Sequence, residues 1–391
     1  MTTPTALPTG QHPTQPRRRS LMFVLAGGAA LTSLPAMAQP TAGKADILIG
    51  RSTALSGGMA PFLSPIHEGQ DAAIEDANAK GGISGRKIRL VTLDDGFDPR
   101  RTLENAKQLS EKDGVLALFG VSGTSQVMAL LPYLAQAKLP LISVYTGSPA
   151  IRAQQHPYLF TTRASYADEL VKIVRNLVAV QTSRIAVAYE NNDFGKLLLP
   201  LVEKTIAAEG ATLAGSHALA SSGDDANTAA KALAAQKPQA VLLVAAGPSV
   251  VAYVRANRAH LGVPVYTLSL GAGTAVLKAL GDDARGLAVA RTGPSPSKPT
   301  IALTRDFQAS MKRHDKPVDY DRYTGYMDAR VLIEGLRAAG PSVTRASLVQ
   351  AMEGLGNLDL GGVGYQFSVQ NHHGSNYVDI AVVGSGGVYR Q

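Results

Sequence analysis

Residues 115–145 read VLALFGVSGTSQVMALLPYLAQAKLPLISVY and alternate between two hydrophobic patterns. Val115–Phe119 and Leu139–Tyr145 are short, almost continuous apolar runs, which are typical of strands buried on both faces. Between them, Ser125–Gln136 is a predicted helix. A strand, a helix and a second strand in this order predict a parallel pair of strands joined by a crossover helix.

The same alternation extends in both directions from this stretch. On its N-terminal side, the predicted elements are strand Ile47–Arg51, helix Ile66–Asn78, strand Ile88–Leu93 and helix Pro99–Glu111. After residue 165 the alternation restarts with strands at Ile185–Tyr189, Thr212–His217, Ala240–Ala245, Val263–Leu268 and Leu287–Arg291. The helices expected among them are Tyr166–Val180, Lys196–Glu209, Asn227–Ala235, Ser249–His260 and Thr274–Leu280. Two successive runs of this kind predict an α/β fold with two Rossmann-like, doubly wound lobes.

The C-terminal part departs from this rhythm. Thr292–Pro299 is rich in Pro, Ser and Gly and is interpreted as a connector between the lobes. It is followed by predicted helices near Ile301–His314, Tyr323–Ala339 and Ser347–Met352, the Gly-rich stretch Gly354–Gly364, and strands at Gly364–Ser368 and Val378–Val383. Because these strands are out of step with the helix–strand alternation, we expect the chain to cross between the lobes three times.

These crossings give a domain prediction. Residues 39–162 and 292–362 are assigned to lobe 1, and residues 163–291 and 363–391 to lobe 2. Ligands of open α/β sheets bind at the carboxyl ends of the strands. Two such lobes that face each other therefore predict a central cleft that closes on a ligand.

The N-terminus has the pattern of an export signal. Arg17, Arg18 and Arg19 precede a short apolar stretch, and Ala36-Met37-Ala38 supplies a small-x-small cleavage pattern, so residues 1–38 are predicted to be removed before Gln39. The twin-arginine pattern also fits Arg18–Met22 (RRSLM), although general secretory signals carry Arg pairs too, so both export routes stay open. An uncleaved anchor is the alternative, but the stretch is shorter than the roughly 20 apolar residues of a membrane span. The expected location is the periplasm.

Composition excludes several classes of function. The chain has no Cys, so an exported form depends on apolar burial and not on disulfides. The formal charge is +8, and removal of three signal arginines leaves +5. Lys and Arg are scattered along the chain, which indicates a solvated surface and no nucleic-acid partner. Trp is absent and aromatic residues make up only 5%, which disfavours a site built on ring stacking.

Three sequence pieces, at their observed spacings, carry a family resemblance: Leu55–Gly58 (LSGG), Asn78–Ile88 (NAKGGISGRKI) and Asp94–Pro99 (DDGFDP). Arg163–Tyr166 and Asn192–Gly195 add to them. With these motifs the chain resembles the type I periplasmic binding proteins of the Leu/Ile/Val-binding group, over nearly all of residues 44–391. The resemblance implies a monomeric, non-enzymatic binder of a small carboxylate that delivers its ligand to an ABC permease and uses no cofactor and no metal.

By this resemblance, the loop Gly120–Ser125 of the first lobe holds the ligand's carboxylate, with Thr124 and Ser125 as hydroxyl ligands. The physics of the loop agrees, because a helix N-terminus offers free N–H groups and a partial positive charge, and small hydroxyl residues let an anion approach. The alternative is that these residues only cap the helix. In the second matching loop, the backbone at Tyr145 and Gly147 and the hydroxyl of Thr146 are expected to contact the ligand's polar end.

The apolar part of the expected site comes from both lobes. Phe62, Phe194 and Tyr145 fall where the family lines its cleft, with ordinary core packing as the alternative for each. When the second lobe closes, we expect residues near Tyr166, Phe194 and Leu270 to reach the ligand.

The chain departs from the family's amino-acid binders at two places. Their disulfide between the Asp-Asp loop and the carboxylate loop has Phe97 and Gly123 at the matching positions here. Their acidic residue against the ligand's ammonium is replaced by Leu270, which offers no counter-charge. Asp168, Glu190 and Asp193 are the possible substitutes on the same lobe.

The ligand therefore stays open between a branched-chain or other hydrophobic amino acid and an amine-free aromatic or aliphatic acid. A periplasmic sensor of the same fold and an enzyme derived from it are the alternatives of other classes. The enzyme alternative lacks support in the sequence, which has no G-x-S-x-G elbow, no P-loop and no Cys nucleophile. His372 and His373 are adjacent, so on a strand they point to opposite faces and do not suggest a joint metal site.

Overall fold

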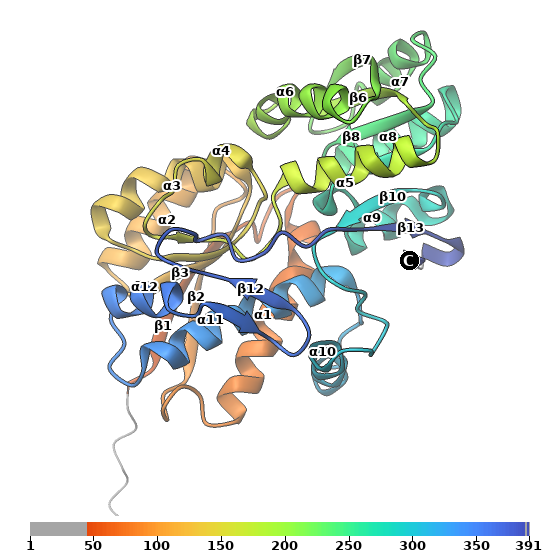
Figure 1. Ribbon diagram of the computed structural model, residues 1–391. Coiled ribbons are helices and arrows are strands. Elements are labelled where there is room, and N and C mark those ends of the chain that lie inside the picture. Colours follow the sequence, from red (N-terminus) through yellow and green to blue (C-terminus); the bar gives the residue numbers. More distant parts are fainter. Residues whose placement is uncertain (1–44, 388, 391) are drawn as a thin grey trace, which may run out of the picture. The chain divides into compact units, whose positions relative to one another are not determined.

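The computed structural model describes residues 45–387, 389 and 390, which belong to one compact unit with two large β-sheets, each covered by helices on both faces, and one two-stranded sheet (Figure 1). The predicted export signal at 1–38 and its cleavage site before Gln39 lie outside the described residues. The predicted class, α/β with two lobes, is confirmed.

The first sheet has five strands in the order β2-β1-β3-β4-β5, and every neighbouring pair is parallel. Its strands are β1 (Ile47–Thr53), β2 (Ile88–Asp94), β3 (Ala117–Ser122), β4 (Leu141–Tyr145) and β5 (Leu159–Phe160). The helices connecting these strands are α1 (Ala60–Ala79), α2 (Pro99–Glu111), α3 (Thr124–Ala137) and α4 (Pro149–Arg152). The helices α10 (Ala302–Arg313), α11 (Tyr320–Ala339) and α12 (Arg345–Glu353) and the hairpin β11 (Asn357–Asp359) and β12 (Gly364–Gln366) also pack on this lobe.

The second sheet has the strand order β14-β13-β10-β9-β8-β6-β7. Its strands are β6 (Arg184–Glu190), β7 (Thr212–Leu219), β8 (Ala240–Val244), β9 (Val265–Thr267), β10 (Ala288–Arg291), β13 (Asp379–Val383) and β14 (Tyr389–Arg390). The helices of this lobe are α5 (Tyr166–Ala179), α6 (Asp193–Ala208), α7 (Ala226–Ala234), α8 (Pro248–His260) and α9 (Thr274–Leu280), with short 3₁₀ turns η1 (Ser269–Ala272), η2 (Gly281–Ala284) and η3 (Ser385–Gly387). Strands β13 and β14 join antiparallel at one edge, where the chain returns from the first lobe.

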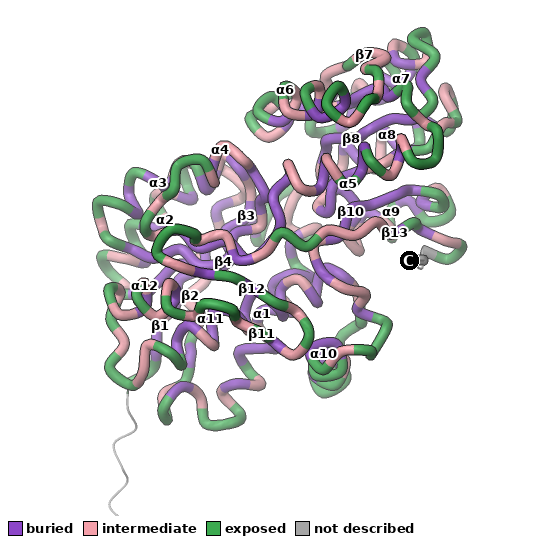
Figure 2. Tube along the Cα trace, in the orientation of Figure 1, coloured by how far each residue is buried: buried purple, intermediate pink, exposed green. Residues whose placement is uncertain are grey.

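The central strands of both sheets are buried on both faces because they are largely apolar. In β3, Phe119 packs into the core under α1 and α11, and its neighbour Leu118 packs into the core under α2 and α3. In the second lobe, Leu243 and Leu242 divide in the same way between α7–α8 and α5–α6. This is the period-2 alternation of a strand between two helical layers. Figure 2 shows the buried residues concentrated along the strands and the exposed ones on the outer helical faces.

Several predicted boundaries differ from the structure by a few residues, and two of them lie near the candidate site. Strand β3 runs from Ala117 to Ser122, so it begins and ends later than predicted. At its end, Val121 pairs with Val144 and extends the strand toward the site. Helix α1 begins at Ala60, well before the predicted Ile66. Pro61 stands in the first turn, where a missing N–H costs nothing, so the helix tolerates an early start.

The chain crosses between the lobes three times: from β5 to α5, from β10 to α10, and before β13. Tyr365 and Phe367 are buried in the core of the first lobe, and Gly374 hydrogen-bonds to the backbone of Thr161. We therefore propose that the last crossing follows Gly374, later than the predicted change of lobe between residues 362 and 363.

Across residues 45–387, 389 and 390, none of the helices combines the length and the apolar character that crossing a bilayer requires.

Candidate functional site

The loops after β3 and β4 lie side by side at the carboxyl edge of the first sheet. Because Ser122 pairs with Tyr145 in parallel register, the residues that follow them leave the sheet together. Thr124 and Thr146 then meet, with their Oγ1 atoms 2.9 Å apart and both side chains buried. The structure thus brings together two of the hydroxyls predicted to bind the carboxylate.

The residue at the N-cap of α3 shows whether Thr124 or Ser125 caps this helix. The N-cap of α3 is Gly123, with φ of 98°, and it provides no side-chain hydrogen bond. Neither Thr124 nor Ser125 therefore acts as the cap. The N-terminal turn of a 14-residue helix keeps N–H groups that no side chain satisfies, beside the Thr124–Thr146 pair.

Ser125 makes a contact between the lobes. Its hydroxyl donates to Asp193 Oδ2 at 3.0 Å, which joins the first turn of α3 to the first turn of α6. Asp193 is one of the carboxylates considered as a partner for a ligand ammonium. The structure shows it instead as a partner of Ser125.

Gly147, Tyr166 and Phe194 form a second part of the site. The backbone N–H of Tyr166 donates to the carbonyl of Gly147 at 2.8 Å, and a Cβ on Gly147 would lie 2.9 Å from the Tyr166 ring. The ring of Phe194 meets Tyr166 edge-on at 5.5 Å between centroids. Tyr166 is buried in the core of the second lobe, whereas Phe194 is half-buried. A side chain larger than hydrogen at Gly147 would separate the loop from α5.

Phe62 and Leu270 pack against different cores of the second lobe, and Leu270 shares its core with Tyr166 and Phe194. Phe62, at the start of α1, packs against the core of the second lobe, and its ring would lie 3.7 Å from a Cβ on Gly247. Leu270 is half-buried in η1 and packs against the other core of that lobe.

The other two carboxylates considered as substitutes are also engaged. Asp168 forms a capping box with Ser165 at the start of α5. Glu190 accepts hydrogen bonds from the backbone N–H of Ala246 at 3.1 Å and from Asn192 Nδ2 at 2.7 Å. Each of the three carboxylates weighed in the sequence analysis is thus held by its own protein partners.

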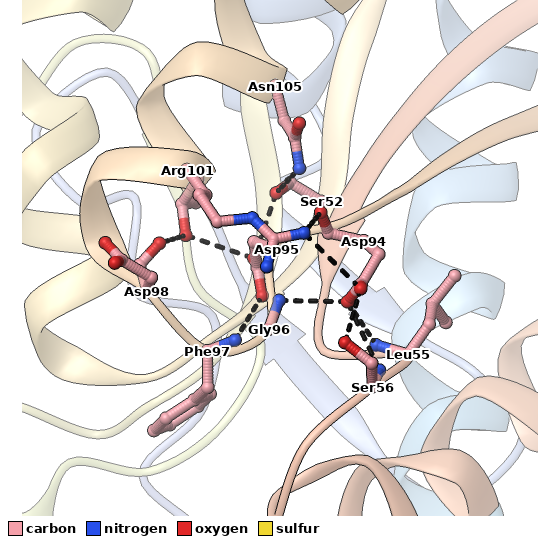
Figure 3. A network of polar contacts seen from close by, with 11 residues as sticks. Ser52, Leu55, Ser56, Asp94, Asp95, Gly96, Phe97, Asp98, Arg101 and Asn105 are labelled. Atoms are coloured by element: carbon pink, nitrogen blue, oxygen red, sulfur yellow. Dashed lines mark hydrogen bonds and ion pairs between the residues drawn. The ribbon is translucent and has the colours of Figure 1, made fainter.

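The Asp94–Asp98 segment of the family motif forms a network of hydrogen bonds with residues at the end of β1 and at the start of α2 (Figure 3). Asp94 Oδ1 accepts hydrogen bonds from the backbone N–H groups of Leu55 (2.9 Å), Ser56 (3.2 Å) and Gly96 (2.9 Å). Its Oδ2 accepts from the Ser56 hydroxyl at 2.5 Å, and this bond and the backbone bonds hold the pKa of Asp94 well below its usual value. The carboxylate therefore ties the loop between β1 and α1 to the end of β2.

Asp95 faces the interior on the opposite side of the strand end. It accepts hydrogen bonds from Ser52, Thr102 and the backbone of Phe97. Burial raises its pKa. The ring of Phe97 would lie 3.0 Å from a Cβ on Gly123, so the two positions of the family's disulfide are neighbours here as well, joined by packing.

Replacing Asp94 by Ala is expected to loosen the loop that begins at Leu55, because two backbone N–H groups lose their acceptor. Amide hydrogen exchange at Leu55 and Ser56 should become faster by about tenfold or more, the equivalent of one ordinary hydrogen bond. The matched control is Asp98→Ala, which removes the N-cap of α2 and the ion pair with Arg100 but no hydrogen bond to Leu55 or Ser56. Unchanged protection in Asp94→Ala would show that the loop is held by other contacts.

A small cavity at the crossings, with a volume of about 10 Å³, is lined mostly by residues that the sequence did not mark as site residues. Tyr145 is the one predicted site residue among its lining, and the others are Arg163, Ser269, Arg291, Thr292, Gly293, Tyr320, Asp321, Tyr323, Thr324 and Met327. They come from the end of β4, from two crossings, from η1 and from α11. Arg163 stood in a quoted motif, but no local signal marked Arg291 or Tyr320.

Within the described part of the chain, no group of three or more His, Asp or Glu side chains is arranged to hold a metal ion.

The comparisons with known proteins agree with this architecture. The profile of the family described as "Periplasmic binding protein" matches residues 46–387. A substrate-binding periplasmic protein from Ralstonia solanacearum has a TM-score of 0.80 and 30% identity, over 88% of this chain and 99% of that protein. A possible leucine/isoleucine/valine-binding protein from Rhodopirellula baltica has a TM-score of 0.83 and 25% identity, over 90% and 98%.

Among curated proteins, the Leu/Ile/Val-binding protein of Escherichia coli (strain K12) is 24% identical over 159 residues. This match covers 40% of this chain and spans less than half of that relative, 43% of its length. The profile, the solved structures and the motifs at Leu55–Gly58, Asn78–Ile88 and Asp94–Pro99 point the same way. The chain belongs to the periplasmic binding protein family, with the type I architecture.

Proposed function

We propose that this chain is the extracytoplasmic substrate-binding component of an ABC importer and that its lobes close on a small carboxylate ligand. The observation that supports it most is the paired hydroxyls of Thr124 and Thr146 beside the N-terminus of α3, at the carboxyl edge of the first sheet. Helix N-termini and hydroxyl donors recognise anions, and ligands of such sheets bind at this edge.

Relatives named for leucine, isoleucine and valine support an amino-acid ligand. The family consists of substrate-binding proteins and not of enzymes, and we propose that this chain is a binding protein too. We propose that it acts in the periplasm and that its partner is a permease.

An amine-free acid is the second candidate for the ligand, and a specific observation favours it. The position expected to face the ammonium is Leu270, and Asp168, Glu190 and Asp193 are all engaged by protein partners. A buried ammonium without a counter-charge is costly. The free acid of a branched or linear chain would avoid that cost.

Replacing Thr124 by Ala is expected to weaken binding of the carboxylate about 10- to 100-fold, because a hydrogen bond to a charged group is lost. Calorimetry with leucine, valine and their amine-free analogues measures the change. Thr212→Ala, at the exposed start of β7, is the matched control and should bind as the unchanged protein does. Equal affinities in both variants would refute the assignment of Thr124.

A further inference from the structure

We infer that the arginines at the crossings hold a second anionic group, so that the ligand of the proposed binding protein is a small dicarboxylate. This inference rests on the proposed function, since it names the ligand class for the same cleft. It starts from Arg163 and Arg291, which line one cavity with Tyr145 and Tyr320.

Both guanidinium groups are buried and fixed by aromatic rings. Arg163 is 4% exposed and lies over the Tyr145 ring at 4.5 Å. Arg291 is 3% exposed and lies against two rings, those of Tyr320 at 4.3 Å and Tyr389 at 4.2 Å from the guanidinium carbon to the ring centroid. Stacking against a ring face orients a guanidinium and leaves its edge free for hydrogen bonds.

Several donors on these edges have no partner. Arg163 Nε and Nη1, Arg291 Nε and the Tyr320 hydroxyl are buried without a hydrogen bond. The remaining donors go to neutral groups, since Arg163 Nη2 donates to Ser269 Oγ and Arg291 Nη2 donates to the Ala272 carbonyl at 2.8 Å. Unpaired donors of charged groups are expensive to bury, and anions are their preferred partners.

Nearby carboxyl groups do not pair with these arginines. Among the ion pairs of the described residues, none includes Arg163 or Arg291. Glu169 accepts from the N–H of Ser269 at 2.7 Å and from its hydroxyl at 2.8 Å. Asp321 accepts from the N–H of Thr274 at 2.5 Å. Burial raises the pKa of both carboxyl groups, and the nearby charges of Arg163 on Glu169 and of Arg291 on Asp321 oppose this rise only in part.

A water molecule could satisfy a free N–H group but not the charge. A carboxylate satisfies both, and its two oxygens match the donor edge of a guanidinium. Tyr145 lines this cavity, and the next residue, Thr146, belongs to the hydroxyl pair with Thr124. The two anion-binding groups are therefore adjacent along the chain, within reach of one short ligand with a carboxylate at each end.

The test compares acids of equal chain length. Calorimetry with succinate, glutarate and adipate against butyrate, valerate and hexanoate should give at least tenfold tighter binding for a diacid, the ratio that one charge-assisted hydrogen bond supplies. Arg291→Gln should remove this preference and leave the monoacid affinity unchanged. Arg89→Gln, an exposed position on β2 with the same change in charge, is the matched control and should keep it.

Tyr320→Phe keeps the ring over Arg291 and removes only the unpaired hydroxyl, so it tests the site even if Arg291→Gln fails to fold. It should weaken diacid binding about fivefold or more and leave the monoacid affinity unchanged. Binding of monoacids or amino acids without a diacid preference would overturn the inference and leave the proposed function intact. Equal losses for monoacids and diacids in a folded variant would also overturn it. A protein that binds none of these acids nor leucine and valine would contradict the proposed function itself.

Discussion

Replacing Gly69 by Ala should destabilise the protein by about 3 kcal/mol or more, at the upper end of the range for overpacking. The same change inside an exposed helix normally stabilises it by about 0.5–1 kcal/mol, so the expected sign is reversed. The reason is a contact between the backbones of α1 and α11. A Cβ on Gly69 would lie 1.9 Å from the carbonyl oxygen of Arg322, and a Cβ on Gly325 would lie 1.9 Å from that of Ile66.

Backbone atoms cannot rotate away as the end of a side chain can, so the two helices would have to separate. They form part of the core of the first lobe, where Ala73 and Tyr323 are buried. Separation would therefore open that core as well as break the contact.

Denaturant unfolding followed by circular dichroism measures this effect. The matched control is Gly58→Ala, because a Cβ on Gly58 meets no atom within 4 Å. This control should unfold at the same denaturant concentration as the unchanged protein. If Gly69→Ala were as stable as Gly58→Ala, the close approach of α1 and α11 would be wrong.

The two-lobed fold could be predicted because it depends on local patterns. The central parallel strands are largely apolar on both faces, and most helices between them are long enough to recognise. The loops after β3 and β4 were predictable for the same reason, since neighbouring parallel strands end at one edge. The contact between Thr124 and Thr146 follows from the register of these strands.

The cavity at the crossings could not be predicted in this way. Arg163, Arg291 and Tyr320 come from three distant parts of the chain and meet only after it has passed between the lobes. In sequence, Arg291 ends an apolar strand, and Tyr320 follows the helix cap Asp319. A single sequence does not say which cations will lose their solvent, because this depends on tertiary packing and not on local propensity.

Engaged side chains mark a second limit. Ser125 and Asp193 were considered separately, one for a carboxylate and one for an ammonium, and the structure pairs them across the lobes. Two residues that were considered for contacts with opposite ends of the ligand are therefore hydrogen-bonded to each other. To recognise such a pair, one must know the distance in space between residues on different lobes, and their spacing along the chain does not give it.

Acidification should destabilise the protein through His67, and the variant His67→Gln should lose less stability than the unchanged protein. His67 lies in α1, is 7% exposed, and its Nε2 is 2.9 Å from the Oγ1 of Thr53. Burial, and then the nearby charge of Arg51, lower its pKa from 6.5 to about 3. The unfolded chain therefore takes up this proton at a higher pH than the folded one, so stability present above pH 6.5 is lost as the pH falls toward 3.

Each pH unit in this window costs about 1.4 kcal/mol, so the loss due to His67 is about 3 kcal/mol when the pH is about two units below the unfolded value. Other groups titrate too: burial raises the pKa of Asp328 to about 7, which favours the fold as the pH falls. The difference between the unchanged protein and His67→Gln removes these shared contributions. Urea unfolding at several values between pH 7.5 and 4.5 should give a difference that grows by about 3 kcal/mol on acidification.

The control for this experiment is Thr53→Val, which removes the hydrogen-bond partner but keeps the buried histidine. Because burial is the larger cause of the low pKa, this variant should retain the pH dependence of the unchanged protein even if its stability is lower at every pH. Parallel curves for His67→Gln and the unchanged protein would mean that His67 takes up its proton in the folded state at an ordinary pH. The end of β1 would then have to be open to water, in conflict with the burial of Thr53 and His67 together.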